Sequence, residues 1–159
     1  MGNIFAGSEI VEIGIQIEKN GFDFYTILTG QTKNPKAKEI FQFLAVEEEK
    51  HIAVFKGILS AVQTYEPAES YPGEYFAYMN ALAGEYVFTQ KDKGKDIAQK
   101  VKSDEEAIDL GIGFEKDSIV FYEGMKKVIP EYDLSLIDQL IAQEQKHLQI
   151  LSDLEHGLN

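Results

Sequence analysis

Apolar residues recur at steps of three and four positions along four long stretches of the chain, a period typical of amphipathic helices. The first stretch begins at Ser8, whose hydroxyl can cap a helix, and fades near Gly30. The second follows Asn34 and Pro35, a capping side chain and a residue suited to the first helical turn, and continues to about Glu66. The loop between these stretches is short, so the two predicted helices are antiparallel.

The second half of the chain predicts a further pair of helices. Ser103, with Glu106 three residues later, forms a capping-box sequence at the start of a stripe that stops before Pro130. The last stripe starts at Asp133, and Gly157 is expected just beyond its end, where glycine often terminates a helix. The two halves therefore have the same predicted organisation.

A long connection, residues 67–102, separates the two hairpins and contains prolines, glycines and an aromatic-rich stretch. We expect one shorter helix within it. A connection of this length can cross the whole bundle, so that the third long helix runs parallel to the second. The predicted fold is all-α: a single domain, residues 1–159, built as a four-helix bundle of two helical hairpins with a long crossover between helices 2 and 3.

The two halves also resemble each other in sequence. Residues 18–25, Glu-Lys-Asn-Gly-Phe-Asp-Phe-Tyr, are echoed by residues 115–122, Glu-Lys-Asp-Ser-Ile-Val-Phe-Tyr. Residues 48–51, Glu-Glu-Lys-His, correspond in the same way to residues 144–147, Glu-Gln-Lys-His. Each half thus supplies one glutamate from its first helix and a Glu-x-x-His motif from its second.

These repeated glutamates and histidines fall on the apolar faces of their helices. A step of three residues turns a helix by about 300°, so Glu144 and His147 point to the same side. Ile137, Leu140 and Leu151 continue the stripe in which both residues stand. The other helices repeat this arrangement, and the side chains expected to face the core together are Glu18, Glu48, His51, Glu115, Glu144 and His147.

Four carboxylates in one core need positive charge beside them, because burying a single unpaired charge costs several kcal/mol or more. No lysine or arginine shares these stripes, whereas two divalent cations neutralise four glutamates and leave both imidazoles neutral. The chain has no cysteine, which excludes thiolate ligands. Carboxylate and imidazole ligands suit iron, with manganese or zinc as alternatives. The pattern therefore predicts two bound metal ions, most simply iron.

The net charge of the chain limits the classes of molecule that it can bind. With 15 basic and 27 acidic residues the formal net charge is -12, so nucleic acid and anionic membranes would be repelled. The first residues do not resemble a signal peptide, and no run of about 18 apolar residues predicts a membrane span. We expect a cytoplasmic protein.

On these motifs the sequence resembles the rubrerythrin branch of the ferritin-like superfamily over nearly its whole length. The resemblance implies a ferritin-like fold in which Glu48 and Glu144 bridge two iron ions. It also implies terminal and capping ligands, one carboxylate and one imidazole for each ion: Glu18, Glu115, His51 and His147. Tyr25 and Tyr122 lie on the ligand-bearing faces, where we expect each hydroxyl to bond a carboxylate, and a redox role is the alternative.

The same resemblance implies an activity. Rubrerythrins reduce hydrogen peroxide at a di-ferrous centre, and this activity protects cells in oxidative stress. Small electron-transfer proteins then reduce the iron again. This chain has no cysteine for a rubredoxin domain, so its donor is expected to be an external protein such as a rubredoxin, and we expect a homodimer. The same hypothesis allows dioxygen as the oxidant in place of hydrogen peroxide.

Two alternatives remain open. Rubrerythrins proper have an additional glutamate three residues after the third-helix ligand, and Ser118 stands at that position. The six remaining ligands are equally similar to the ferroxidase centre of bacterioferritins, so ferroxidase activity or iron handling is the first alternative. The second is a non-catalytic helical bundle that is stabilised by its metals.

Overall fold

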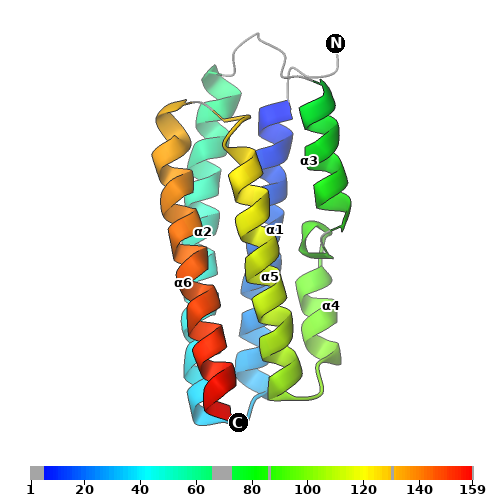
Figure 1. Cartoon of the computed structure of the whole chain (residues 1–159), viewed down its shortest axis with the longest axis vertical. Helices are drawn as coiled ribbons and strands as arrows, with labels where there is room; N and C mark the ends of the chain where they lie inside the picture. Colours follow the sequence, from blue (N-terminus) through cyan, green and yellow to red (C-terminus); the bar gives the residue numbers. More distant parts are fainter. Residues whose placement is uncertain (1–5, 66–72, 86, 130, 159) are drawn as a thin grey trace.

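The computed structural model describes residues 6–65, 73–85, 87–129 and 131–158. Within these residues four long helices lie side by side along one axis (Figure 1): α1 Ala6–Gln31, α2 Pro35–Tyr65, α5 Asp104–Met125 and α6 Leu134–Leu158. α1 packs mainly against α2 and α5 mainly against α6, as expected of two hairpins. The prediction of an all-α four-helix bundle is confirmed. The helix limits expected at Glu66 and Pro130 lie outside the described residues.

In the first hairpin the predicted cap is present at α2 but not at α1. The Asn34 side chain accepts hydrogen bonds from the backbone N–H groups of Lys36 (2.9 Å) and Ala37 (3.0 Å), which starts α2. The prediction that Ser8 caps α1 is wrong, because the helix already includes Ala6, a residue that strongly favours helix. Ser8 is instead buried within the first turn.

The second hairpin shows one confirmed cap and one correction. Ser103 Oγ accepts a hydrogen bond from the N–H of Glu106 at 3.1 Å, as the capping box predicts. α6 follows directly after the short 3₁₀ helix η2 (Glu131–Asp133), close to its expected start. The prediction for Gly157 is wrong, because α6 continues through it to Leu158. No glycine in the described ranges has the positive φ of a left-handed helix cap.

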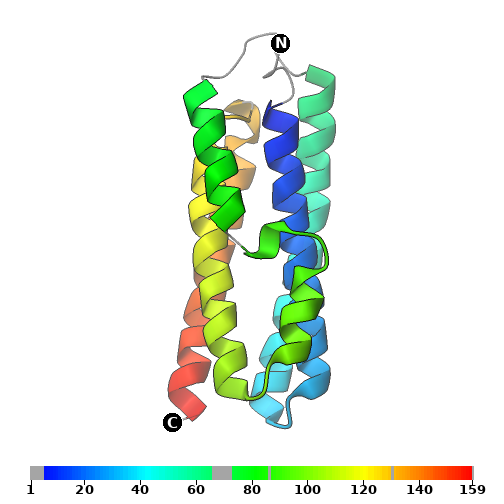
Figure 2. The ribbon, with the colours of Figure 1, turned by 90° about the vertical axis from the view of Figure 1, so that its right-hand side faces the viewer.

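The crossover contains two helices where one was expected. α3 (Gly73–Glu85) and α4 (Lys93–Lys100) are separated by the 3₁₀ helix η1 (Val87–Thr89), and they lie end to end along the outside of the bundle (Figures 1 and 2). The backbone changes direction just before α4, where Asp92 adopts a left-handed conformation with φ 62°. The crossover runs from one end of the bundle to the other, so α5 is parallel to α2 as predicted.

One buried side chain holds the crossover against α1. Asn20 donates hydrogen bonds from Nδ2 to the carbonyl oxygens of Phe88 (2.6 Å) and Gln90 (2.7 Å), and its Oδ1 accepts one from the N–H of Gly94 (3.1 Å). A Cβ on residue 94 would stand 2.0 Å from the Asn20 carbonyl oxygen, so only glycine lets α4 approach this closely. The helical periodicity had assigned no role to Asn20.

The core between the four long helices is filled with aromatic and aliphatic side chains. Its largest fully buried members include Phe24, Phe41, Phe55 and Phe121. None of the described helices is both long and apolar enough to cross a membrane. Polar groups interrupt this apolar interior between the four long helices, where the predicted site residues lie.

Candidate metal centre

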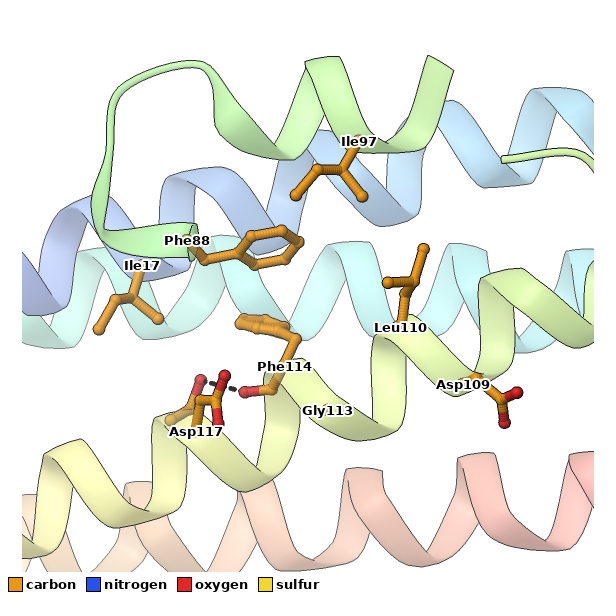
Figure 3. Close-up of a pocket in the computed structure, with 9 residues that line it drawn as sticks. Ile17, Phe88, Ile97, Asp109, Leu110, Gly113, Phe114 and Asp117 are labelled. Carbon is orange, nitrogen blue, oxygen red and sulfur yellow. Dashed lines mark hydrogen bonds between the residues drawn. The ribbon is translucent and has the colours of Figure 1, made fainter. Parts of the chain in front are cut away.

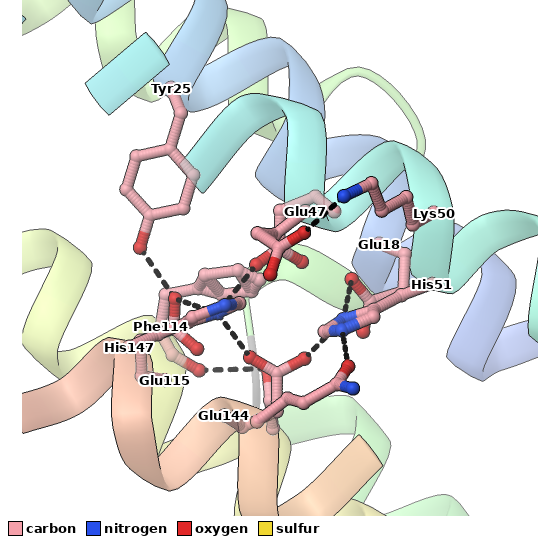
Figure 4. A network of polar contacts seen from close by, with 12 residues as sticks. Glu18, Tyr25, Glu47, Lys50, His51, Phe114, Glu115, Glu144 and His147 are labelled. Atoms are coloured by element: carbon pink, nitrogen blue, oxygen red, sulfur yellow. Dashed lines mark hydrogen bonds and ion pairs between the residues drawn. The ribbon is translucent and has the colours of Figure 1, made fainter. Parts of the chain in front are cut away.

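The six predicted site residues come from the four long helices, and the five of them that Figure 4 labels converge on one region: Glu18, His51, Glu115, Glu144 and His147. α1 contributes Glu18 and α5 contributes Glu115, while α2 and α6 each contribute one Glu-x-x-His pair. The four glutamates are completely inaccessible to solvent, and both histidines are 2% exposed. The apolar periodicity therefore placed these side chains on the correct faces. Their role as metal ligands stays a prediction.

The side chains form two clusters, each with four candidate ligand atoms that lie within 4.8 Å of one another. The first cluster contains Glu18 and His51, and the second contains Glu115 and His147. Glu48 and Glu144 belong to both clusters. A carboxylate has two oxygens and can place one in each cluster. The arrangement has the geometry of a site for two metal ions with two shared carboxylates.

Both imidazoles turn Nδ1 toward the carboxylates. His51 Nδ1 is 2.9 Å from Glu144 Oε1 and 3.5 Å from Glu18 Oε2. His147 Nδ1 lies 3.2 Å from Glu144 Oε2, and its ring is stacked on that of His51 with centroids 5.6 Å apart. Nδ1 is therefore the nitrogen that each histidine can offer to a metal.

Gln143 supports this orientation and was missed by the sequence analysis. Its Oε1 lies 2.6 Å from Nε2 of His51. An amide oxygen only accepts hydrogen bonds, so Nε2 carries the proton and donates it to Gln143. In the neutral imidazole this leaves the lone pair of Nδ1 free for a metal, the usual arrangement around a metal-bound histidine. The only sequence signal was its position beside Glu144.

Two buried tyrosines form hydrogen bonds between the two halves of the duplication. The Tyr25 hydroxyl donates a hydrogen bond to Glu115 Oε1 at 2.8 Å, and the Tyr122 hydroxyl donates one to Glu18 Oε1 at 2.5 Å. Burial raises the pKa of both phenols well above the ordinary value, and the charges of the bonded glutamates raise it further. Both tyrosines are thus protonated donors that orient the carboxylates, as the simpler interpretation expected.

Several carboxylate oxygens in this network have no hydrogen-bond partner among the described residues. They are Glu18 Oε2, both oxygens of Glu48, and Glu115 Oε2. Buried polar atoms are normally paired, so these atoms require an additional partner. They come from the members of the two clusters, and a pair of cations would contact all of them. The residues present therefore fit a dimetal centre.

Burial and crowding of the charged groups also shift the pKa values of the metal-free site. Burial raises the pKa of Glu48 and of Glu115 well above the ordinary value, and the charge of Glu144 raises both further. Burial alone lowers the pKa of His51, but the charge of Glu18 and the hydrogen bonds to Glu144 and Glu18 raise it to about 11. Without metals, protons must provide part of the compensation that cations would supply.

Ser118 shows what stands in place of the additional glutamate of rubrerythrins proper. It is 1% exposed, and its Oγ donates a hydrogen bond to the carbonyl oxygen of Phe114 at 2.9 Å, within its own helix. It belongs to neither of the two ligand clusters. The described part of the chain thus presents six ligand side chains to the centre.

The comparisons with known proteins agree with this geometry. A family model described as Rubrerythrin matches residues 9–155. A solved structure from Thermotoga maritima, described as a candidate ferritin-like diiron-carboxylate protein, is similar with a TM-score of 0.75 at 25% sequence identity. That match covers 96% of this chain and 96% of the other, which confirms the ferritin-like fold. The search of curated proteins gave no significant match.

Proposed function

The chain belongs to the rubrerythrin family, and from this premise we propose that it is a di-iron carboxylate oxidoreductase that reduces hydrogen peroxide, or dioxygen, with electrons from an external donor. The observation that carries the proposal is the pair of buried clusters that share Glu48 and Glu144. Two adjacent metal positions suit a reaction that takes two electrons at one place. Oxygen-rich ligation with one imidazole for each ion suits iron, with manganese and zinc as alternatives.

The chain's own residues divide into shared and separate ligands. We assign Glu48 and Glu144 to both ions, because each belongs to both clusters. Glu18 and His51 then complete one position, and Glu115 and His147 the other. A pair of ferrous ions held there would supply the two electrons that the oxidant needs. The pseudo-symmetric halves of the chain hold one terminal carboxylate and one imidazole for each ion.

The surrounding residues orient this set and keep bulk water from it. The hydroxyls of Tyr25 and Tyr122 hold the terminal carboxylates, and Gln143 holds His51 in the tautomer that exposes Nδ1. The buried side chains of Phe55 and Phe114 lie beside the two tyrosines. Preorganised ligands of this kind require little rearrangement when the metal charge changes. A redox role for either tyrosine is the alternative to simple orientation.

The proposal includes two partners of the chain. Reduction of each oxidant molecule leaves the iron oxidised, and a sequence without cysteine holds no thiolate-bound redox centre to reduce it again. We therefore propose an external electron-transfer protein, such as a rubredoxin, as the donor. We also propose a homodimer as the functional unit, which sedimentation analysis of the purified protein would test.

The direct experiment uses the metal-free protein. It is loaded with ferrous iron without oxygen, given one equivalent of hydrogen peroxide, and followed by the near-ultraviolet absorbance of ferric iron. We expect oxidation of about two iron ions per chain within minutes, because the two clusters define two positions. Glu48→Gln should abolish this fast phase, since Glu48 belongs to both clusters.

The neighbouring residue provides a matched control. Glu49 directly follows Glu48 in α2 but is exposed, so Glu49→Gln should oxidise iron like the wild type. Absence of any oxidation in the wild type would contradict the proposal. Tightly bound zinc that neither exchanges nor reacts would instead favour the non-catalytic, metal-stabilised bundle.

One observation supports ferroxidase activity as a second candidate. Ser118 is bonded to its own helix and offers no carboxylate to the centre, so the six-ligand set matches the bacterioferritin pattern equally well. Iron storage would require a cage of many subunits and the uptake of far more iron than the two clusters can bind. Sedimentation that shows only monomers or dimers would exclude storage and leave the oxidoreductase proposal in place.

A further inference from the structure

A pocket of about 180 Å³ lies between α5 and the crossover (Figure 3). Its walls come from α1, η1, α4 and α5, and the apolar side chains among them are Ile17, Phe88, Ile97, Leu110 and Phe114. Leu110 is 38% exposed, so the pocket opens to solvent at this side. Ile17 and Phe114 are almost completely buried, and each directly precedes a predicted metal ligand in sequence. Phe114 also packs against Tyr25, which bonds Glu115, with ring centroids 6.0 Å apart, so the end of the pocket at Phe114 lies near the metal centre.

The Phe114 side chain belongs both to the pocket lining and to the surroundings of the candidate ligands. Phe114 lines the pocket, yet two of its ring atoms lie 2.6 Å from the point where a Cβ on Gly21 would stand. Glu48 Oε2 lies 3.2 Å from the same point. The Phe114 ring thus lines the pocket and also lies near Oε2 of the shared carboxylate Glu48. Gly21 lacks the side chain that would otherwise occupy this space.

The chemistry of the pocket restricts what can enter it. Asp109 and Asp117 belong to its lining and would repel anions. Hydrogen peroxide could donate hydrogen bonds to these two carboxylates, but it would lose its water hydrogen bonds wherever it meets the five apolar side chains, at a cost of roughly 2–7 kcal/mol for each unpaired polar group. Dioxygen carries neither charge nor strong hydrogen bonds. A small apolar gas is the ligand that the pocket admits with least penalty.

We propose that this pocket delivers dioxygen to the metal centre, with Phe114 as the last barrier, and that it admits dioxygen in preference to hydrogen peroxide. The inference rests on the proposed function, because it names the oxidant that one entrance of the same centre selects. No bond is formed in the pocket. Phe114 acts on access alone, through the position of its ring between the pocket and Glu48.

The chain offers a matched pair of variants for testing this. Gly113 lines the pocket, and a Cβ added there would meet no atom within 4 Å, so Gly113→Leu is the substitution chosen to fill the pocket. Gly57 in α2 is also a helical glycine with open space around its Cβ, and it does not line the pocket. Gly57→Leu is therefore the control for the change in helix propensity.

The first readout requires no metal. Xenon binds apolar cavities of about 150 Å³, so it is a suitable probe for this pocket. In the metal-free protein under xenon pressure, we expect shifts in the methyl NMR signals of Ile17, Ile97 and Leu110. The same shifts should appear in Gly57→Leu and vanish in Gly113→Leu. Absence of xenon shifts in the wild type would overturn the inference.

The second readout compares two oxidants on the ferrous-loaded protein. Gly113→Leu should slow oxidation by dioxygen by about tenfold or more, which corresponds to about 1.4 kcal/mol in barrier height, while oxidation by peroxide keeps its wild-type rate. Phe114→Leu, with a smaller barrier, should accelerate the dioxygen reaction. Equal slowing of both oxidants, or no slowing of either, would overturn the access route and leave the proposed function intact. Failure of the wild type with both oxidants would overturn the proposed function and this inference with it.

Discussion

At the scale of single residues, the centre depends on side chains that reach across the duplication. Tyr25 comes from the first half and bonds the terminal glutamate of the second, while Tyr122 does the reverse. Each tyrosine lies seven residues after a predicted ligand of its own helix but serves the other one. The two halves therefore orient each other's ligands, and neither hairpin forms a complete site alone.

This cross-pairing leads to a prediction for Tyr122→Phe. The change removes the hydrogen bond to Glu18 and leaves the ring in place, so the carboxylate loses its fixed orientation. We expect the affinity for the first metal to fall by about 10- to 100-fold, as is usual when a partner of a metal ligand is removed. Titration calorimetry with manganese would measure it. Tyr78→Phe, at a half-exposed position away from the site, should retain wild-type affinity.

The imidazoles allow a prediction on pH. In the metal-free protein the pKa of His51 is raised to about 11 and that of His147 to about 10, above the ordinary 6.5, because the surrounding carboxylates outweigh burial. A raised folded-state pKa contributes stability that is fully present below pH 6.5 and is lost as the pH rises through 10 to 11. Thermal unfolding in a chelator at pH 7 and pH 10 should therefore show a lower midpoint at pH 10.

The metal-loaded protein is the comparison for this experiment. A metal-bound imidazole carries no proton at Nδ1, so loaded protein should lose much less stability over the same range. Equal pH dependence of the loaded and metal-free forms would show that His51 and His147 are not the groups responsible.

At the scale of elements, the crossover is fixed by a polar contact. α4 lies against α1 because Asn20 bonds two carbonyl groups and one N–H of the connecting segment, and because Gly94 has no side chain to prevent the approach. These bonds replace those that the backbone would make in a continuous helix, between η1 and α4. The same contact places Phe88 next to Phe114, with ring centroids 4.6 Å apart.

We expect Asn20→Ala to destabilise the protein without unfolding the four long helices. It leaves the carbonyl of Phe88 and the N–H of Gly94 buried without these partners, at a cost of about 2–4 kcal/mol in total. Urea unfolding would measure the loss, and hydrogen exchange should show faster exchange at Gly94. Gln90→Ala is the control: it keeps the backbone carbonyl that Asn20 bonds, so its stability should change by less than about 0.5 kcal/mol.

At the scale of the whole molecule, the bundle and its charge are linked. Four of the 27 acidic residues converge inside a chain whose formal net charge is -12. Cations at the centre relieve repulsion among helices from both hairpins at once, because the ligands come from all four long helices. Metal binding should therefore stabilise the complete bundle and not one hairpin.

This predicts a stoichiometry and a stability increase. Two divalent ions should bind per chain, judged from the two clusters, and metal at about 100 times its dissociation constant should add about 2.7 kcal/mol for each site. Native mass spectrometry with manganese and thermal unfolding would measure both. His147→Ala should bind one ion less tightly or lose it, and its thermal midpoint with metal should fall.

The chain contains a matched control for this substitution. His156 is the third histidine, exposed near the end of α6 and outside both clusters. His156→Ala should bind two ions with wild-type affinity. If it lost metal as His147→Ala does, the ligand assignment would be wrong.

The sequence by itself determined the helices and the faces on which the site residues lie. Apolar residues at steps of three and four select one side of each helix, and Glu144 and His147 share that side because of the helical repeat alone. The duplicated motifs then identified all six cluster members before any contact was known. These are local properties, readable from neighbours a few positions apart.

Only the tertiary structure decided which side chains meet across the bundle. The pairing of Tyr25 with Glu115 joins residues 90 positions apart, and the hydrogen bond that His51 donates to Gln143 joins residues 92 apart. The role of Asn20 and the pocket behind Phe114 likewise depend on where the crossover docks. Periodicity describes which way a residue faces on its own helix. The partner it reaches depends on how the helices pack, and no local pattern records that.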